Sequence, residues 1–376
     1  MRRVWVLLGL LLATAGHAES LPVPAPPQIA AKSLYLMDSS SGKVLAEADA
    51  RVPLAPASLT KLMTAYTVFE ALSAGSITLD DEVRVSERAW RAPGSRMFIE
   101  VDTKVRVEDL VRGMIIQSGN DASIALAEHV AGSVEAFVAL MNEHAEALGM
   151  TDTAYGNPTG LSGAGHLSSA RDSAILAQAI IEEFAGYYAW YGEREFTYNG
   201  ITQHNRNALL WRDESVDGLK TGHTNAAGYC LVSSAERSGM RLIAVVMGMT
   251  NPDARTAASQ ALLDYGFQFF ETHKIYARGQ QVTQARVWKG EPHTVALGLS
   301  DDLYVTIPRG RYQDLGGTME LIADLVAPLG VSAQVGAVHI SFRGEDLAVL
   351  PLVSLHAVAE APLWTRIADE LKLWLE

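Results

Sequence analysis

The spacing of hydrophobic and polar positions changes along the chain and separates helical from strand-like regions. Two strand-like runs, 32–38 and 43–49, surround the turn "SSSG" and predict a β-hairpin. Between Thr60 and about Tyr191 helical periodicity dominates, and it predicts helices at 59–75, 107–117, 121–132, 134–149 and 170–184. Strand-like runs return at 217–222, 228–237 and 240–249, before a predicted helix at 256–271.

These elements define two domains and a tail. Strands from both ends of the first region are expected to share one antiparallel sheet with the helical block between them, which gives an α/β (α+β) domain over 28–276. From about Gln281, short strand candidates alternate with turn residues and no helical pattern interrupts them. This pattern predicts a small all-β domain over 280–356.

The tail, 361–376, has the pattern of a short amphipathic helix. Its apolar positions fall mostly on one face and its charged positions elsewhere, and the apolar residues are Leu363, Trp364, Ile367, Leu371, Trp374 and Leu375. Such a helix favours the membrane interface, with the two tryptophans at the edge of the apolar stripe. The alternative is a helix that packs on the domain or forms a dimer contact.

The N-terminus has the pattern of a signal peptide over 1–18. Arg2 and Arg3 precede the apolar run "VWVLLGLLLATA", and "GHA" supplies small residues before Glu19. The apolar run is short for a membrane span, although a retained anchor helix is the alternative. We therefore expect an exported protein that begins near Glu19, with an extended proline-rich segment, "LPVPAPPQIA", after it.

Composition excludes several functions. The 376 residues suffice for two domains, and the net charge of −13 argues against nucleic-acid binding, which needs clustered Lys and Arg. The single cysteine, Cys230, lies in the strand-like "GYCLVSS", so we expect a buried small hydrophobic residue rather than a nucleophile. No His and Cys cluster at zinc spacing, so we predict neither a metal site nor a cofactor.

Two Ser-x-x-Lys pairs occur, and only one has helical geometry. Ser40 and Lys43 lie on the predicted hairpin turn and the strand after it, so nothing brings their side chains together. Ser58 and Lys61 lie at a predicted helix start, where residues i and i+3 share a face. A serine needs a base to become a nucleophile, and a lysine can be that base only if burial or a neighbouring cation lowers its pKa.

Further elements supply the partners that such a pair needs. "IIQSGNDAS" places Ser118 and Asn120 at the join between two predicted helices. "VDGLKTGHT" places polar and small residues on a strand, which could pair with a substrate chain, and these are Lys220, Thr221, Gly222 and His223. Gly222 would leave room for that approach, and the backbone N–H groups of Ser58 and His223 are candidate oxyanion donors. Together, Ser-x-x-Lys, a Ser/Asn element and Lys-Thr-Gly form the signature of penicillin-recognising serine enzymes.

The segments "PASLTKLMT", "SGNDAS", "DGLKTGHTNAAGY" and "YGFQFFET" resemble the D-alanyl-D-alanine carboxypeptidases among the low-molecular-mass penicillin-binding proteins of bacteria. The resemblance runs from about Ala30 to the tail and includes "YVTIPRGR". It implies a β-lactamase/transpeptidase-like first domain and cleavage of the terminal D-alanine from peptidoglycan stem pentapeptides through an acyl-enzyme. It also implies acylation by β-lactams, and a location on the periplasmic face of the inner membrane.

The resemblance also implies roles for individual residues. Ser58 would be the nucleophile and Lys61 its base, while Ser118 and Asn120 would relay protons and hold the substrate amide. The opposite wall would consist of Lys220, Thr221 and His223. Arg255 would lie near the substrate carboxylate, unless it is a surface helix cap, and Arg206 of "NRN" would assist it. Asn225 departs from the family pattern, which often has Asp there, and Asn120 has a helix cap as its alternative role.

Three other functions compete with this hypothesis. A class A β-lactamase needs a carboxylate that activates water, but 151–170 contains no Glu and only one acid, Asp152. An endopeptidase that cleaves cross-links would use the same acyl chemistry. A non-enzymatic wall-binding scaffold would require a vestigial site, although every chemical element is present.

Overall fold

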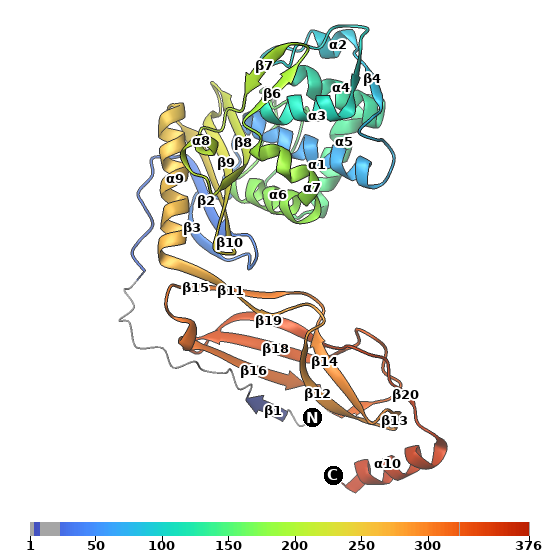
Figure 1. Ribbon diagram of the computed structural model, residues 1–376. Helices are drawn as coiled ribbons and strands as arrows, with labels where there is room; N and C mark the ends of the chain where they lie inside the picture. Colours follow the sequence, from blue (N-terminus) through green and yellow to red (C-terminus); the bar gives the residue numbers. More distant parts are fainter. Residues whose placement is uncertain (1–3, 8–22, 323, 376) are drawn as a thin grey trace. The chain divides into compact units, whose positions relative to one another are not determined.

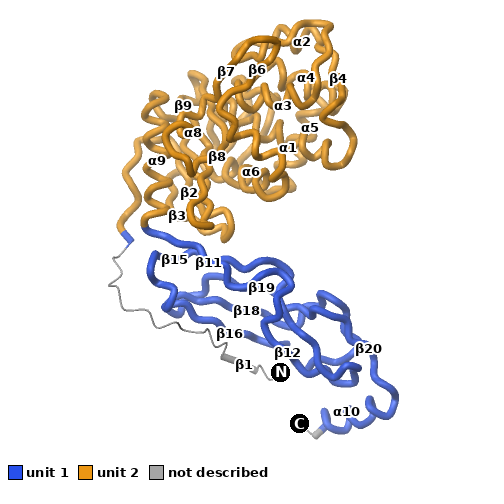
Figure 2. Tube along the Cα trace, in the orientation of Figure 1, with its two compact units in different colours: residues 1–23, 269–376 blue, residues 24–268 orange. Residues whose placement is uncertain are grey.

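The computed structural model describes residues 4–7, 23–322 and 324–375. Contacts divide the chain into two compact units, 24–268 and 269–376, the second of which also takes in residues 1–23 (Figure 2). Most of the predicted signal peptide lies outside the described residues, apart from Val4–Leu7, which form β1. The signal peptide therefore stays a prediction.

A five-stranded antiparallel sheet forms one half of the unit 24–268, in the order β3-β2-β10-β9-β8. Its strands are β2 (Ser33–Asp38), β3 (Val44–Ala48), β8 (Val216–Thr224), β9 (Gly228–Arg237) and β10 (Met240–Met249). The predicted hairpin is confirmed, because β2 pairs with β3 and Ser40 lies in the turn between them. Strands from both ends of the region share this sheet as expected, and β8 lies at one edge.

Helices cover both faces of the sheet (Figure 1). The helices of this unit are α1 (Thr60–Ser73), α2 (Glu87–Trp90), α3 (Val107–Ile116), α4 (Asn120–Ala131), α5 (Val134–Ala147), α6 (Ala170–Glu183), α7 (Ala185–Tyr188), α8 (Leu209–Arg212) and α9 (Pro252–Phe269). Helix α6 packs against β2 and β10 from the side of the helical block. On the other face α9 comes close to the sheet at Gly266, where a Cβ would lie 2.4 Å from Leu242 Cδ1. The predicted α/β packing is confirmed.

Helix α1 is the buried centre of the helical block. Its side chains are buried from Thr60 to Phe69, so the residues just before it are held in place by the core. Two short antiparallel strand pairs, which the sequence did not predict, also belong to this unit. They are β4 (Glu82–Arg84) with β5 (Lys104–Arg106), and β6 (Glu195–Tyr198) with β7 (Ile201–His204).

The unit 269–376 is built from short strands, which confirms the predicted all-β domain. Its larger sheet has the order β1-β16-β18-β19-β14-β12-β17. Besides β1, its strands are β12 (Gln281–Trp288), β14 (Thr294–Leu299), β16 (Leu315–Leu321), β17 (Leu325–Val326), β18 (Gln334–Phe342) and β19 (Glu345–Ser354). Two smaller pairs are β11 (Phe270–Tyr276) with β15 (Leu303–Pro308), and β13 (Gly290–Glu291) with β20 (Ala359–Glu360). Its core includes Val287, Leu297, Val338 and Leu352.

The boundary between the units differs from the sequence expectation. The sequence kept residues up to 276 in the first domain, and it continued the predicted helix to 271. In the structure α9 ends at Phe269, and Phe270–Tyr276 form β11, which pairs with β15 of the second unit. These backbone hydrogen bonds assign the segment to the β unit, where its residues pair with those of an antiparallel partner strand.

The tail forms α10 (Leu363–Leu375), close to the predicted range. Its polar side meets the β unit, because the buried Asp369 accepts a hydrogen bond from Lys289 N at 2.8 Å. Among the described residues, no helix on its own is both long and apolar enough to cross a membrane. Helices α4 and α5 meet that criterion only as a pair, with an 85° bend between them.

Candidate active site

Ser58 and Lys61 meet at the start of α1. Ser58 lies in a 3-10 turn, Ala57–Leu59, that leads directly into the helix at Thr60. The i,i+3 spacing still works, because Lys61 Nζ lies 3.3 Å from Ser58 Oγ. The backbone before it is strained, since Ala57 has a φ of 47°, a left-handed value that a non-glycine residue rarely adopts.

Lys61 is buried, with 1% of its surface exposed, and two oxygens hold its amino group. Its Nζ donates to Asn120 Oδ1 at 2.6 Å and to the carbonyl oxygen of Thr159 at 2.5 Å. Burial lowers the pKa of Lys61 from 10.5 to about 7, and the positive charge of Arg206 adds to this effect. A lysine in this state is a competent base near neutral pH.

The turn before α4 places Ser118 and Asn120. Ser118 has a φ of 67°, and its buried Oγ has no hydrogen-bond partner within the described part of the chain. Asn120 is the first residue of α4 and does not cap it, because the N-cap is Gly119 and no side chain caps this end. The alternative role of Asn120 as a cap is therefore wrong. Its amide instead bridges Lys61 and the carbonyl oxygen of Pro93, at 2.6 Å from Nδ2.

The edge strand β8 forms the facing wall. Lys220 is 2% exposed, and its pKa is lowered by burial and by the nearby charges of Lys61, Arg206 and Arg255. Thr221 is buried against the cavity, and the His223 ring stacks on Tyr229 at 4.0 Å between centroids.

Gly222 has a different neighbour from the one expected. A Cβ there would lie 3.1 Å from the Pro56 carbonyl oxygen and 3.2 Å from Ser58 N. The room that this glycine leaves is therefore taken by the backbone of the nucleophile turn itself. The close approach holds the edge strand directly beside Ser58.

Two arginines reach the cavity from outside these motifs. Arg255 lies in the first turn of α9 and is 6% exposed, so it is no surface cap. Its guanidinium lies 6.0 Å from the Tyr229 ring centroid, and its Nε has no partner within the described residues. Arg206 donates from Nη2 to Ser95 Oγ at 2.9 Å, and Ser95 Oγ in turn donates to the Gln117 carbonyl oxygen.

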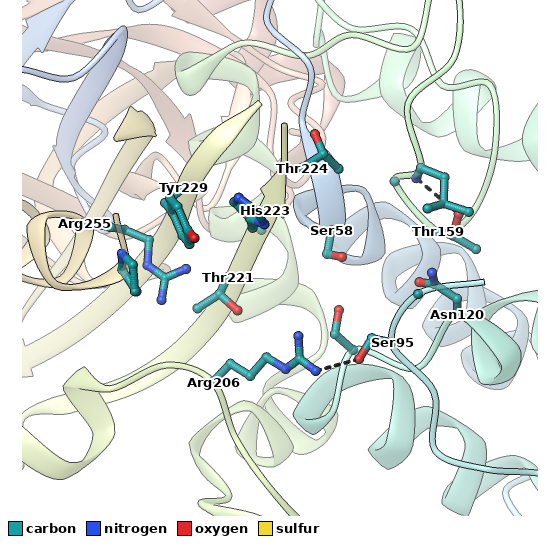
Figure 3. A pocket seen from close by; sticks show the side chains of 16 residues that line it. Ser58, Ser95, Asn120, Thr159, Arg206, Thr221, His223, Thr224, Tyr229 and Arg255 are labelled. Carbon is teal, nitrogen blue, oxygen red and sulfur yellow. Dashed lines mark hydrogen bonds between the residues drawn. The ribbon is translucent and has the colours of Figure 1, made fainter. Parts of the chain in front are cut away.

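These residues enclose a cavity of about 400 Å³ (Figure 3). Of the predicted site residues, Lys61 and Lys220 lie buried behind its wall, and the others line it: Ser58, Ser118, Asn120, Arg206, Thr221, Gly222, His223 and Arg255. No carboxylate appears among the described residues that line the cavity. The pocket therefore presents hydroxyl groups, an amide and cationic groups to a ligand.

Sequence reasoning missed half of the sixteen lining residues, among them the polar Ser95, Thr159 and Tyr229. Tyr229 follows the Lys-Thr-Gly strand and pairs with His223 across the hairpin, so strand register could have found it. Ser95 and Thr159 lie on irregular segments, and no local pattern marks them. Asn225 lies exposed in the turn between β8 and β9.

Comparison with known proteins agrees with this geometry. The D-alanyl-D-alanine carboxypeptidase family model matches residues 21–251, which is more than half of the chain. This chain belongs to that family. A second model, the C-terminal domain of penicillin-binding protein 5, matches residues 270–360. The resemblance expected from the motifs is confirmed, and it extends over both units.

Individual members of the carboxypeptidase family match nearly the whole chain. D-alanyl-D-alanine carboxypeptidase DacA of Escherichia coli K12 is 42% identical over 387 residues, covering 99% of this chain and 96% of that protein. DacC of the same organism is 43% identical over 367 residues, covering 96% and 92%. Among solved structures, penicillin binding protein 5 from Haemophilus influenzae is 42% identical with a TM-score of 0.85, covering 90% of this chain and 100% of that one.

Proposed function

We propose that this protein is a serine D-Ala-D-Ala carboxypeptidase that removes the terminal D-alanine from peptidoglycan stem peptides through an acyl-enzyme on Ser58. The observation that carries the proposal is the buried Lys61, whose Nζ lies 3.3 Å from Ser58 Oγ and whose pKa is about 7. Family membership and relatives named D-alanyl-D-alanine carboxypeptidase support it.

The bonds around Lys61 suit it to act as a base. A neutral amine has two hydrogens and one lone pair. Asn120 Oδ1 and the Thr159 carbonyl oxygen accept the two hydrogens, so the lone pair is left for the hydroxyl hydrogen of Ser58. Lys61 would take that proton as Ser58 Oγ bonds to the carbonyl carbon of the penultimate residue.

Breakdown of the tetrahedral intermediate completes acylation. The C–N bond to the terminal D-alanine breaks, and Ser118 would pass a proton to the leaving amine, because its buried Oγ has no other partner in the described structure. The developing oxyanion would face backbone N–H groups of Ser58 and His223. Water then attacks the Ser58 ester, which releases the shortened peptide and restores the serine.

The charges of the cavity fit the substrate's terminal carboxylate. Arg206 and Arg255 line the pocket, and Lys220 lies behind Thr221, while no described lining residue is acidic. We assign Thr221 and Arg255 to carboxylate binding and Asn120 to the substrate amide. Edge strand β8 is suited to pair with the peptide backbone.

β-Lactams would acylate the same serine. Opening of their ring breaks an amide C–N bond in the same way, and penicillin-binding protein D2 of Listeria monocytogenes, with a TM-score of 0.60 and 28% identity, was solved in an ampicillin-bound form. Efficient hydrolysis of the β-lactam-derived ester, as in a class A β-lactamase, would need a carboxylate beside the water. The candidate Asp152 instead pairs with Arg51 at 3.0 Å and does not line the cavity, which argues against a β-lactamase.

The protein is proposed to act outside the cytoplasm, on the periplasmic face of the inner membrane. The apolar face of α10 is exposed, with exposed fractions of 65% at Leu363, 81% at Trp364 and 87% at Trp374. A helix with tryptophans on an apolar face suits the headgroup region. It would bring the enzyme close to substrate that is anchored at the same membrane.

Mass spectrometry of purified protein tests the activity. Incubation with penicillin should add one penicillin mass to Ser58, and a pentapeptide ending in D-Ala-D-Ala should lose one alanine. A cross-linked dimer in a parallel reaction distinguishes an endopeptidase. Absence of both the adduct and the shortened peptide would reject the proposed function.

A further inference from the structure

Asp121, next to Asn120 in α4, is a fully buried carboxylate that is held by backbone N–H groups. Its Oδ1 accepts from Met97 N at 3.0 Å and from Ala122 N at 2.9 Å. Its Oδ2 accepts from Phe98 N at 2.9 Å and from Ile99 N at 3.3 Å. Three of these donors belong to the segment 97–99, which is remote in sequence. The carboxylate therefore fastens that segment to the start of α4.

The fastened segment forms part of the cavity wall. Asn120 donates two hydrogen bonds to the chain from Pro93 to Ile99. Its backbone N donates to the Ser95 carbonyl oxygen at 2.7 Å, and its Nδ2 donates to the Pro93 carbonyl oxygen. Ser95 itself lines the cavity, where its Oγ accepts a hydrogen bond from Arg206 (Figure 3). Asn120, which holds Lys61, is thus positioned by the same segment that Asp121 secures.

Backbone conformations on both sides of Asp121 need this support. Phe98 has a φ of 69° and Ser118 a φ of 67°, which are left-handed values that non-glycine residues rarely adopt. Gly119 shows how tightly the parts fit, because a Cβ there would lie 2.9 Å from Asp121 Oδ1 and 3.3 Å from Met97 N. No ordinary side chain at 119 fits without shifting the carboxylate.

Asp121 also places a negative charge near the base. The charged groups around Lys61 are Arg206 on the cavity wall, Lys220 on β8 and Asp121 on α4. Arg206 lowers the pKa of Lys61, and Asp121 acts in the opposite direction by raising it. Within the described part of the chain, the hydrogen-bond donors to Asp121 are neutral backbone N–H groups, so no ion pair offsets its charge.

We propose that Asp121 is a positioning residue for the reaction: it fastens the wall segment 93–99 to the Ser118–Asn120 turn, and its negative charge partly offsets the cationic groups around Lys61. This inference rests on the proposed function, in which Lys61 deprotonates Ser58. It makes Asp121 act through Asn120 and Lys61, without contact with the substrate.

Two variants separate the geometric role from the charge. Asp121→Asn keeps the size but leaves one acceptor oxygen, so two of the four N–H groups face an amide NH₂ and the charge is lost. Gly119→Ala keeps the charge and moves the carboxylate, and the φ of −59° at 119 suits alanine. The second-order rate constant for acylation by a fluorescent penicillin would be measured from pH 5 to 9 for both.

We expect Asp121→Asn to lower the plateau rate constant at least about tenfold, because misplacing catalytic groups by a fraction of an ångström has costs of this order. Its acid limb should also move to lower pH, since a charge that raises the pKa of Lys61 is gone. Gly119→Ala should lower the plateau while its acid limb stays in place. The Gly119→Ala result keeps the test informative even if Asp121→Asn folds poorly.

A matched control is Asp213→Asn. Asp213 is partly buried and accepts four hydrogen bonds, from Ser215, Gln260 and Arg237, but it does not line the cavity. This variant should melt at lower temperature and keep both plateau and acid limb. An Asp121→Asn acid limb that is unmoved, or a plateau within about twofold of the wild type, overturns the proposal. Labelling of a Ser58→Ala protein would instead overturn the proposed function itself.

Discussion

The pKa of Lys61 determines the pH dependence of acylation. Burial and Arg206 lower this pKa from 10.5 to about 7, which corresponds to about 5 kcal/mol at roughly 1.4 kcal/mol per unit. At pH 7 about half of Lys61 is then the free base, against about one in three thousand for a lysine of ordinary pKa. The wild-type rate constant should therefore reach a plateau above pH 8 and fall about tenfold per unit well below pH 7.

Arg206→Gln perturbs this pKa without touching Lys61. Removing a cation that lowers the pKa of Lys61 must raise it, so the acid limb should move to higher pH. The plateau rate constant will also fall, because Arg206 donates a hydrogen bond to Ser95 and attracts anionic ligands. The pH at which the acid limb lies does not depend on the height of the plateau. The assay is the rate of fluorescent penicillin labelling between pH 5 and 9.

Arg84→Gln is the matched charge control. The Arg84 side chain is 75% exposed, pairs with Asp102 and does not line the cavity, so its loss should leave the limb in place. A wild-type midpoint above pH 9 would refute the assignment of Lys61 as a base with a lowered pKa. An Arg206→Gln limb at the wild-type position, or at lower pH, would refute the electrostatic argument.

Three further predictions concern other parts of the chain. Ser58→Ala should abolish penicillin labelling and D-alanine release, whereas Ser40→Ala, in the hairpin turn, should change neither; labelling of folded Ser58→Ala protein would reject the nucleophile. Truncation at Pro362 should yield a soluble enzyme with near-normal activity on small D-Ala-D-Ala peptides that no longer co-sediments with anionic liposomes, and equal sedimentation of both forms would remove the anchor hypothesis. Burial lowers the pKa of His166 from 6.5 to about 4, so the folded state favours the neutral imidazole. The free energy of unfolding should therefore fall as the pH drops from 6.5 to 4, by about 3 kcal/mol in total. Thermal melts of the wild type and His166→Gln at pH 7 and 4.5 measure this, and an equal loss on acidification in both would contradict it.

The motif residues could be predicted from the sequence because regular elements carry them. Ser58 and Lys61 share a helical spacing, and Thr221 to His223 follow a strand whose register is fixed by β9. Helical periodicity also gave the ends of α3 to α6 within a few residues. Ser169 caps the start of α6, since its Oγ accepts from Asp172 N at 3.1 Å. Cys230 is buried as expected.

The start of α9 could have been found but was not. Asn251 Oδ1 accepts from Ala254 N at 2.8 Å, and Pro252 is the first helical residue, which together form a standard N-terminal signal. The sequence contains both residues, yet apolar periodicity begins only four residues later. With the helix starting at Pro252, Arg255 falls in the first turn and faces the cavity.

The places of Ser95 and Thr159 at the cavity could not be predicted, because only tertiary contacts bring their segments to the other site residues. The position of Ser95 depends on Asn120 and Gln117, which lie more than twenty residues away. Thr159 is turned by the side chain of Asn157, whose Oδ1 accepts from Thr159 N at 3.0 Å and Gly160 N at 2.8 Å. Only the folded chain brings the Thr159 carbonyl oxygen to Lys61.

The charge of the whole chain and the charge of the cavity have opposite signs, and the distances involved reconcile them. A net charge of −13 is spread over the surface, where salt screens each charge within about 8 Å. The two lysines and Arg255 are buried beside a cavity lined by no described carboxylate, so their field is screened far less. The desolvation that makes this cluster unfavourable to bury also lowers the pKa of Lys61. An anion that enters the cavity would offset the positive charge of the neighbouring cations. In the proposed function a substrate carboxylate would supply that anion, so binding and base activation would have one physical origin.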